Sequence, residues 1–193
     1  MRTALASVLL SLLLATGCGR STRFFSLQPS GEAAAFHGDS PGVSVEVRRV
    51  DFPAYLNSPQ MVTPGASGEV KLDDKNLWVD DLAGDFQRVF VQDLSSRLKS
   101  SSVFVSGTST RTPDVIVQVD VARFDVDEDR NANLTARWTV SRDDSGLGAR
   151  SGVAVLEEPH VGSGQAGTVA ALSSLVDRLS SQIAAAVPQV HTH

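Results

Sequence analysis

Three glycines form the one sequence motif that is associated with cofactor chemistry. Gly162, Gly164 and Gly167 match the GxGxxG spacing with which a chain approaches a dinucleotide pyrophosphate ahead of a helix. That chemistry also needs a following parallel strand and an acidic residue about 20 positions later. A single predicted helix follows the glycines, and its Asp177 is the last acidic residue of the sequence. We therefore interpret the three glycines as a loop that begins a helix.

The other residue types that perform chemistry lack the spacing of a catalytic or metal site. The histidines have no ligand partner at helical spacing, and no GxSxG elbow follows a predicted strand. The acidic clusters lack the regular ligand ladder and the glycine of a calcium loop, so we expect solvated turns and helix caps. The histidines are His37, His160, His191 and His193, and the acidic clusters are Asp73-Asp74, Asp80-Asp81, Asp127 to Asp129 and Asp143-Asp144. The sequence therefore predicts no catalytic residue, no metal site and no cofactor.

Cys18 is the only cysteine, which excludes an internal disulfide. It follows an uncharged, mostly apolar run from Ala4 to Ala15 that is too short to cross a membrane, since a crossing needs about 20 helical residues. Ala15-Thr16-Gly17-Cys18 resembles a bacterial lipobox, in which the thiol forms a thioether to diacylglycerol and cleavage makes the cysteine an N-acylated N-terminus. The alternative is an ordinary cleavage site, Ala15-x-Gly17, that releases a protein with a free thiol.

A lipid anchor on the cysteine also predicts where the protein lies and how it is divided. Gly19 stands in place of the aspartate that retains lipoproteins in the inner membrane, so we expect an anchor on the periplasmic face of the outer membrane. We expect residues 1–17 to be a signal peptide and residues 18–23 to be the lipidated cysteine and its tether. One domain would then span residues 24–188, followed by a flexible tail at 189–193.

The composition is that of a globular domain. Of the 193 residues, 41% are hydrophobic and 20% are charged, close to ordinary soluble proteins. Acidic residues outnumber basic ones by 22 to 17. Because there is no basic surplus, nothing in the charge indicates nucleic acid or anionic lipid as a partner.

Two periodicities predict the elements that would position these residues. Apolar residues at three- and four-residue steps predict amphipathic helices over 81–99 and 168–186, the second ended by Pro188. Alternating apolar residues predict strands, joined by a hairpin turn at 64–68 and by an antiparallel meander in the centre. The predicted strands are residues 24–27, 43–48, 60–63, 69–72, 103–105, 115–126, 133–141 and 149–156, with a bulge near Val121-Ala122. We therefore expect an α+β fold: a single domain with a mainly antiparallel twisted sheet and two amphipathic helices packed on it.

Three large aromatic side chains allow two interpretations. Tyr55, Trp78 and Trp138 could line a lipid groove, or they could fill the core. Trp138 lies on a clean strand alternation with Leu134 and Val140, which favours the core. The helix at 168–186 lacks a Lys/Arg excess on its polar side, so its apolar face is also expected to pack in the core and not on a bilayer.

Four short segments occur in an order that is typical of one family. They are Arg23-Phe24-Phe25-Ser26-Leu27, Val45-Glu46-Val47, Phe52-Pro53-Ala54-Tyr55-Leu56 and Asn76-Leu77-Trp78. With the lipobox before them and a helix from Leu82 after them, they resemble the ABC-type transport auxiliary lipoprotein family, which includes PqiC-like lipoproteins. The resemblance runs from the signal through the last helix, and its most specific pieces are Pro-x-Tyr-Leu and Asn-Leu-Trp.

The resemblance implies a non-enzymatic auxiliary component of an ABC/MCE-type intermembrane lipid transport system that supports outer-membrane integrity. Its partners would be an MCE-domain protein or ABC transporter components, with multivalency from sheet-edge pairing or ring assembly of identical copies. The family-motif residues that the resemblance offers for partner contact are Pro53, Tyr55, Leu56, Asn76, Leu77 and Trp78. Two alternatives stay open: a periplasmic carrier that binds lipid or a small molecule in its own cavity, and a hydrolase with an unrecognised site.

Overall fold

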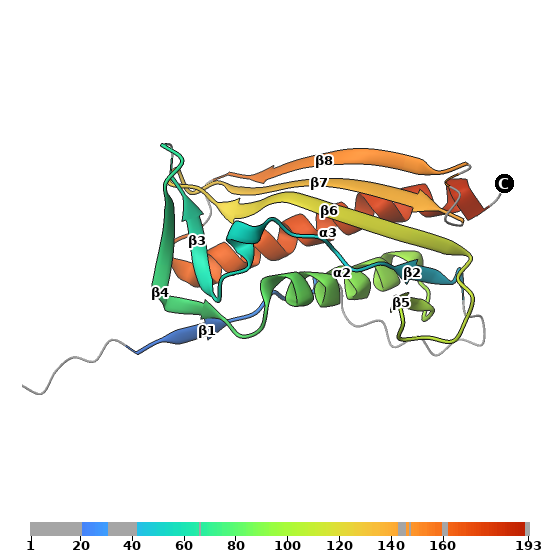
Figure 1. The fold of residues 1–193 in the computed structure, drawn as a ribbon, viewed down its shortest axis with the longest axis horizontal. Helices are drawn as coiled ribbons and strands as arrows, with labels where there is room; N and C mark the ends of the chain where they lie inside the picture. Colours follow the sequence, from blue (N-terminus) through green and yellow to red (C-terminus); the bar gives the residue numbers. More distant parts are fainter. Residues whose placement is uncertain are drawn as a thin grey trace, which may run out of the picture.

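A computed structural model describes residues 21–30, 42–65, 67–142, 146, 148–159 and 162–191. The predicted signal peptide, Cys18, His37, His160, His193 and the Asp143-Asp144 pair lie outside these residues. The described residues form two sheets and two long helices in one α+β domain, which confirms the predicted fold class (Figure 1).

The larger sheet has five strands in the order β5-β2-β6-β7-β8. These strands are β2 (Val45–Val47), β5 (Val103–Val105), β6 (Val115–Val126), β7 (Ala132–Ser141) and β8 (Arg150–Glu158). Strands β6, β7 and β8 form the predicted antiparallel meander, and the register shifts between Val121 and Arg123, which confirms the predicted bulge. Strand β2 pairs in parallel with both β5 and β6.

A second sheet replaces part of the single sheet expected from the sequence. Its three strands, in the order β1-β4-β3, are β1 (Arg23–Phe25), β3 (Gln60–Pro64) and β4 (Val70–Trp78). Strands β3 and β4 form the predicted hairpin, whereas β1 joins β4 in parallel with Phe24 opposite Leu77. Alternation along one strand does not indicate which distant strand it pairs with, so the division into two sheets could not be predicted.

Helix α2 (Leu82–Leu98) has the predicted boundaries because both of its ends are capped. The Asp81 carboxylate accepts a hydrogen bond from the backbone N–H of Gly84 at 2.7 Å, which satisfies a donor that the first turn leaves unpaired. At the other end Lys99 adopts a left-handed conformation with φ of 49° and ends the helix.

Helix α3 (Gly164–His191) is longer than predicted. The prediction that Pro188 ends the helix is wrong, because the helix continues through it into residues 189–191 of the predicted tail. Val187 and Val190 are both buried in the core. Their burial offsets the cost of a proline inside a helix, which is about 3 kcal/mol.

The GxGxxG glycines serve the start of α3, as predicted. Gly164 begins the helix with a φ of 77°, a conformation that favours glycine. A Cβ on Gly167 would overlap the carbonyl oxygen of Gly162. No strand follows α3 in the described chain, so the context of a dinucleotide site is not present there.

The core lies between the helices and the larger sheet. Helix α3 runs along β6, β7 and β8, and α2 lies beside it (Figure 1). Phe86 and Phe90 of α2 stack with ring centroids 6.3 Å apart, and Phe86 meets Phe124 of β6 edge-on at 5.2 Å. These fully buried rings join α2 to the sheet.

Trp138 packs against the core, as predicted, but is only half-buried. Its ring covers Gly152, its partner on β8, so closely that a Cβ on Gly152 would lie 2.5 Å from Cζ2 of Trp138. The glycine therefore provides the room that the indole occupies.

Candidate partner-contact site

The family-motif residues converge at the end of the molecule where the three-stranded sheet meets the helices (Figure 1). Pro53 precedes a short 3-10 helix, η2 (Ala54–Leu56), and Trp78 ends β4. Leu56 and Trp78 are buried and line the same interior cavity of about 20 Å³. Both side chains belong to the core, so they support the surface at this end and do not form it.

Tyr55 is half-buried, and its orientation is fixed by a hydrogen bond. Its hydroxyl donates to Oδ2 of Asp125 at 3.2 Å, and the buried Asp125 carboxylate also forms an ion pair with Arg123 at 3.0 Å. Burial, together with the negative charge of Asp125, raises the pKa of Tyr55 to about 12. The phenol therefore stays neutral at physiological pH, and its polar end is already occupied within the protein.

Asn76 is buried and connects three elements. Its Oδ1 accepts a hydrogen bond from Nε of Arg23 on β1 at 3.1 Å, and its Nδ2 donates to Oδ2 of Asp73 at 2.6 Å. Gln165 of α3 donates to the same Asp73 oxygen at 3.0 Å. Burial alone would raise the pKa of Asp73, but the hydrogen bonds outweigh burial and lower it. The network ties β1, β4 and α3 together.

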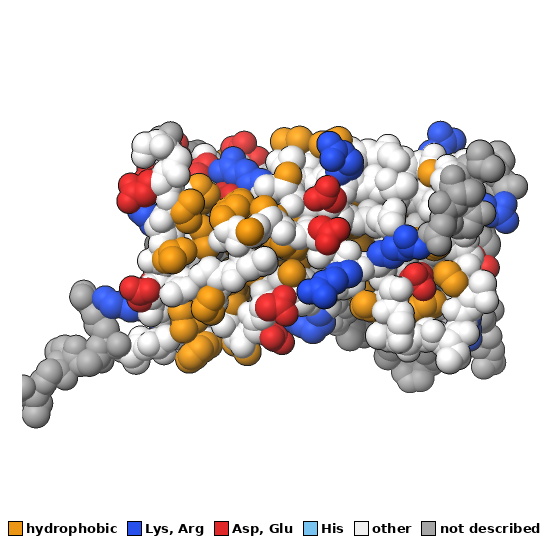
Figure 2. Space-filling view, viewed as in Figure 1, with side chains coloured by type: hydrophobic (Ala, Val, Ile, Leu, Met, Phe, Trp, Pro, Cys, Tyr) orange, Lys and Arg blue, Asp and Glu red, His pale blue; other side chains and the backbone are white. Residues whose placement is uncertain are grey.

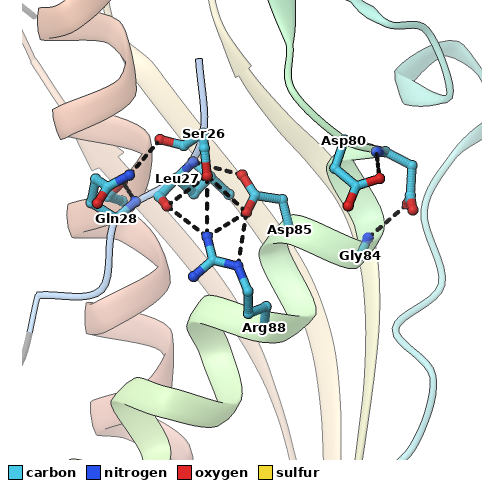
Figure 3. A network of polar contacts seen from close by, with 9 residues as sticks. Ser26, Leu27, Gln28, Asp80, Gly84, Asp85 and Arg88 are labelled. Carbon is cyan, nitrogen blue, oxygen red and sulfur yellow. Dashed lines mark hydrogen bonds and ion pairs between the residues drawn. The ribbon is translucent and has the colours of Figure 1, made fainter. Parts of the chain in front are cut away.

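Residues 26–30, which follow β1 and are called the strap below, are held against the helices by side chains (Figure 3). The backbone N–H of Leu27 donates to Oδ2 of Asp85 at 2.6 Å, and Nη2 of Arg88 donates to the carbonyl oxygen of Leu27 at 2.9 Å. Arg88 and Asp85 also form an ion pair at 2.5 Å. The Leu27 side chain is fully buried. The strap is therefore fixed to α2 by its backbone as well as by its side chain.

Two further bonds extend this attachment to the end of the strap. The backbone N–H of Gln28 donates to Oγ of Ser173 on α3 at 3.0 Å, and that of Ser30 donates to Oδ1 of Asp93 on α2 at 3.0 Å. Sequence reasoning missed these residues, although one signal was present. Asp85 and Asp93 fall on the buried face of α2 with Phe86 and Val89, and a buried carboxylate needs hydrogen-bonding partners.

An apolar patch, called the β1 patch below, lies on the outside of the same end. It consists of Phe24, Leu77 and Val79. Phe24 is 62% exposed and Val79 is 64% exposed, and Leu77 is half-buried opposite Phe24. Val79 is held beside β1 because its backbone N–H donates to the carbonyl oxygen of Phe25 at 2.8 Å. Hydrophobic side chains gather over β1, β3 and β4 in the space-filling view (Figure 2). Of the motif residues, Leu77 is the one that joins this patch.

A second exposed apolar pair lies on β8, the edge strand of the larger sheet. Val153 and Val155 point away from the core, and Val155 is 74% exposed. Figure 1 shows β8 along the opposite side of the molecule from β1. An edge strand presents backbone groups that a further strand could pair with.

Of the acidic clusters within the described ranges, Asp80-Asp81 and Asp127 to Asp129 form a helix cap and a turn, as the sequence suggested, whereas Asp73 and Asp74 lie within β4. Asp81 caps α2, and Asp127 closes the turn after β6 by accepting a hydrogen bond from the backbone N–H of Asn131 at 2.9 Å. In the part of the chain that the structure describes, no three His, Cys, Asp or Glu side chains are grouped to hold a metal ion. None of the described helices is long and apolar enough to cross a membrane.

Comparison with protein families gives one match that covers most of the chain. The sequence model of the family described as ABC-type transport auxiliary lipoprotein component matches residues 25–184. No curated protein matches the chain significantly.

Two solved structures show the same fold at low sequence identity, and a third is less similar. The crystal structure of an uncharacterized protein superposes with a TM-score of 0.70 at 19% identity, covering 86% of this chain and 97% of that one. A protein from Xanthomonas campestris assigned to the family model DUF330 gives 0.62 at 13% identity, covering 89% and 96%. A PelC dodecamer from Paraburkholderia phytofirmans gives 0.43 at 12% identity, covering 77% and 90%.

Proposed function

Since the chain belongs to the ABC-type transport auxiliary lipoprotein family, we propose that it is a PqiC-like lipoprotein that assists MCE-type lipid transport between the two membranes. Members of this family are auxiliary components of ABC-type transport systems, which supports a non-enzymatic role. The family match over residues 25–184 carries the proposal, because it includes every strand except most of β1, all of α2 and most of α3. Lipid on Cys18 would hold the domain at the periplasmic face of the outer membrane.

The proposed mechanism is docking. The anchored domain receives one end of an MCE-protein conduit, or a periplasmic part of the ABC transporter, on a face of the folded domain. The strap supports this role, because it binds the chain that follows the anchor to α2 and α3 through backbone hydrogen bonds. A force on the anchor is therefore transmitted through the strap to the core of the domain, and not to a loosely attached terminus.

Several copies acting together would strengthen docking without strong single contacts. The exposed Val153 and Val155 on the edge strand β8 favour sheet-edge pairing between identical copies. Native mass spectrometry of the lipoprotein in detergent would measure this association. We expect an oligomer that Val155→Asp dissociates and that Leu72→Asp, at an exposed position on the other sheet, leaves intact.

The carrier alternative receives less support from the interior. Sites that hold a small molecule commonly measure about 300–1,000 Å³, whereas the cavity beside Trp78 measures about 20 Å³. That space is too small for an acyl chain. Three hollows on the surface of the described residues measure about 530, 550 and 590 Å³, and each has charged side chains in its lining, among them Arg49, Asp81 and Lys71. A lining with charged side chains does not favour the binding of an apolar lipid tail, because charges lose hydration beside it.

Affinity capture of the full-length lipoprotein tests the proposal against the carrier alternative. The tagged protein is purified after crosslinking from cells that contain the whole transport system, and the captured proteins and lipids are identified by mass spectrometry. We expect the MCE-domain protein or an ABC component in the crosslinked sample, and no stoichiometric lipid beyond the covalent anchor. Stoichiometric lipid without either partner would contradict the docking role and favour the carrier.

A further inference from the structure

The position of the anchor limits how far the β1 patch can lie from the membrane. Phe24 is six residues after Cys18 in the sequence. A fully extended chain spans at most about 3.3–3.6 Å per residue, so these six residues reach about 20 Å at most. If Cys18 carries lipid, as the proposed function holds, Phe24 lies within about 20 Å of the bilayer surface.

The chain after Phe24 gives no additional reach. Strand β1 is paired with β4, and the strap that follows is bound to α2 and α3. Leu27 is fully buried and its backbone N–H and carbonyl groups are both bonded, to Asp85 and Arg88. The body of the domain therefore cannot move away from the anchor by releasing this segment without losing those bonds. The end that carries β1 therefore stays close to the membrane.

That end presents the β1 patch to the bilayer. Phe24 and Val79 are more than half exposed, and an apolar side chain at a bilayer interface gains free energy by entering the boundary between headgroups and acyl chains. The two acidic residues that follow Val79 have carboxylates engaged within the protein. Asp80 accepts a hydrogen bond from the backbone N–H of Asp81 at 2.9 Å, and Asp81 caps α2 (Figure 3). Arg23, also exposed, adds a positive charge beside Phe24.

We infer that the β1 patch is a membrane-contact surface, which inserts Phe24 and Val79 into the interface of the bilayer that holds the anchor. This inference rests on the proposed lipidation of Cys18. It fixes the orientation of the domain as well as its distance from the membrane. Strand β8, which runs along the opposite side of the molecule from β1, is then left accessible to a protein partner (Figure 1).

A fluorescent label at one position tests the contact in the full-length lipoprotein. Cys18 is the only native cysteine, and a thioether to lipid blocks its reaction with thiol reagents. An engineered cysteine is then the one labelling site. Val79→Cys places an environment-sensitive fluorophore in the β1 patch, and Thr110→Cys places it at an exposed position of the loop that joins β5 to β6, at the other end of the molecule (Figure 1). Both proteins are reconstituted into vesicles of phosphatidylethanolamine and phosphatidylglycerol that contain lipid with a nitroxide near the top of the acyl chain.

We expect the label at position 79 to lose roughly half of its emission to the nitroxide, because an interfacial side chain lies about 5–10 Å into the boundary region. The label at position 110 should lose almost none. Vesicle flotation is measured on the same samples. Flotation without quenching at position 79, or with equal quenching at both positions, would overturn the membrane contact and leave the anchor intact. A protein that does not float with the vesicles would overturn both the anchor and the contact.

Discussion

Removing one buried carboxylate should weaken the attachment of the strap while leaving the rest of the domain folded. Asp85 is 6% exposed, and its carboxylate accepts hydrogen bonds from the Leu27 backbone N–H and from Oγ of Ser26 at 3.1 Å. It is also paired with Arg88. In Asp85→Ala the Leu27 N–H keeps its buried position and loses its acceptor.

The magnitude follows from these contacts. A buried donor left without an acceptor costs about 1–3 kcal/mol. Loss of the ion pair with the half-exposed Arg88 adds up to about 1 kcal/mol, since solvent screens that pair. We therefore expect Asp85→Ala to lower the free energy of unfolding by about 1–4 kcal/mol, a substantial part of the roughly 5–15 kcal/mol of a typical domain. Asp85→Asn keeps an acceptor and should cost about half as much.

Two measurements on the full-length protein check this reasoning. Urea unfolding gives the free energy, and hydrogen exchange reports the opening of the Leu27 amide. Exposed Asp74→Ala is the matched control and should change stability by no more than about 0.5 kcal/mol. The reasoning is refuted if Asp85→Ala unfolds like the control, or if the Leu27 amide exchanges as slowly in the variant as in the wild type. Burial of the Leu27 side chain alone would then account for the strap.

Three other predictions test separate parts of the molecule. Cys18→Ser should abolish incorporation of radioactive palmitate and leave an uncleaved or soluble product, which membrane fractionation detects; equal labelling of the variant would contradict lipidation. Gly152→Ala should lower the free energy of unfolding, measured with urea, by about 1–3 kcal/mol, because its Cβ would overlap the Trp138 ring. Gly162→Ala, at an open position, is the control and should change this free energy little. Because the folded-state pKa of Tyr55 is raised from 10.0 to about 12, the neutral phenol contributes stability that is complete below pH 10.0 and is lost as the pH rises toward about 12. Thermal melts over this range should therefore fall more steeply for the wild type than for Tyr55→Phe, and parallel curves would contradict the assigned environment.

The local elements were predictable because their signals are local. The 3.6-residue period and the caps placed α2 to within one residue of its boundaries. A change of parity in one strand located the bulge after Val121, since successive side chains alternate between faces. The GxGxxG glycines were predicted to begin a helix because the surrounding elements of a dinucleotide site were missing from the sequence, and in the structure they lie at the start of α3.

The motif residues show where this kind of inference stops. The sequence brought Pro53, Leu56, Asn76 and Trp78 forward as candidates for partner contact, but it could not sort buried residues from exposed ones. In the structure Leu56, Asn76 and Trp78 are buried, whereas Phe24 and Val79 carry the exposed apolar surface. Whether an apolar residue is buried or exposed depends on which elements cover each other. The sequence of a single strand or helix does not contain this information.

The sequence by itself determined the helices, the hairpin, the meander and the bulge, together with the chemistry available at Cys18, because periodicity, turn residues and residue type act over a few positions. Tertiary structure decided what depends on contacts between distant segments. It paired β1 with β4 across 53 positions, carried α3 past Pro188 by burying Val187 and Val190, and brought Asp85 against the backbone of Leu27. Each of these outcomes is stabilised by groups that meet only after the chain has folded, so their free energy has no signature in the local pattern.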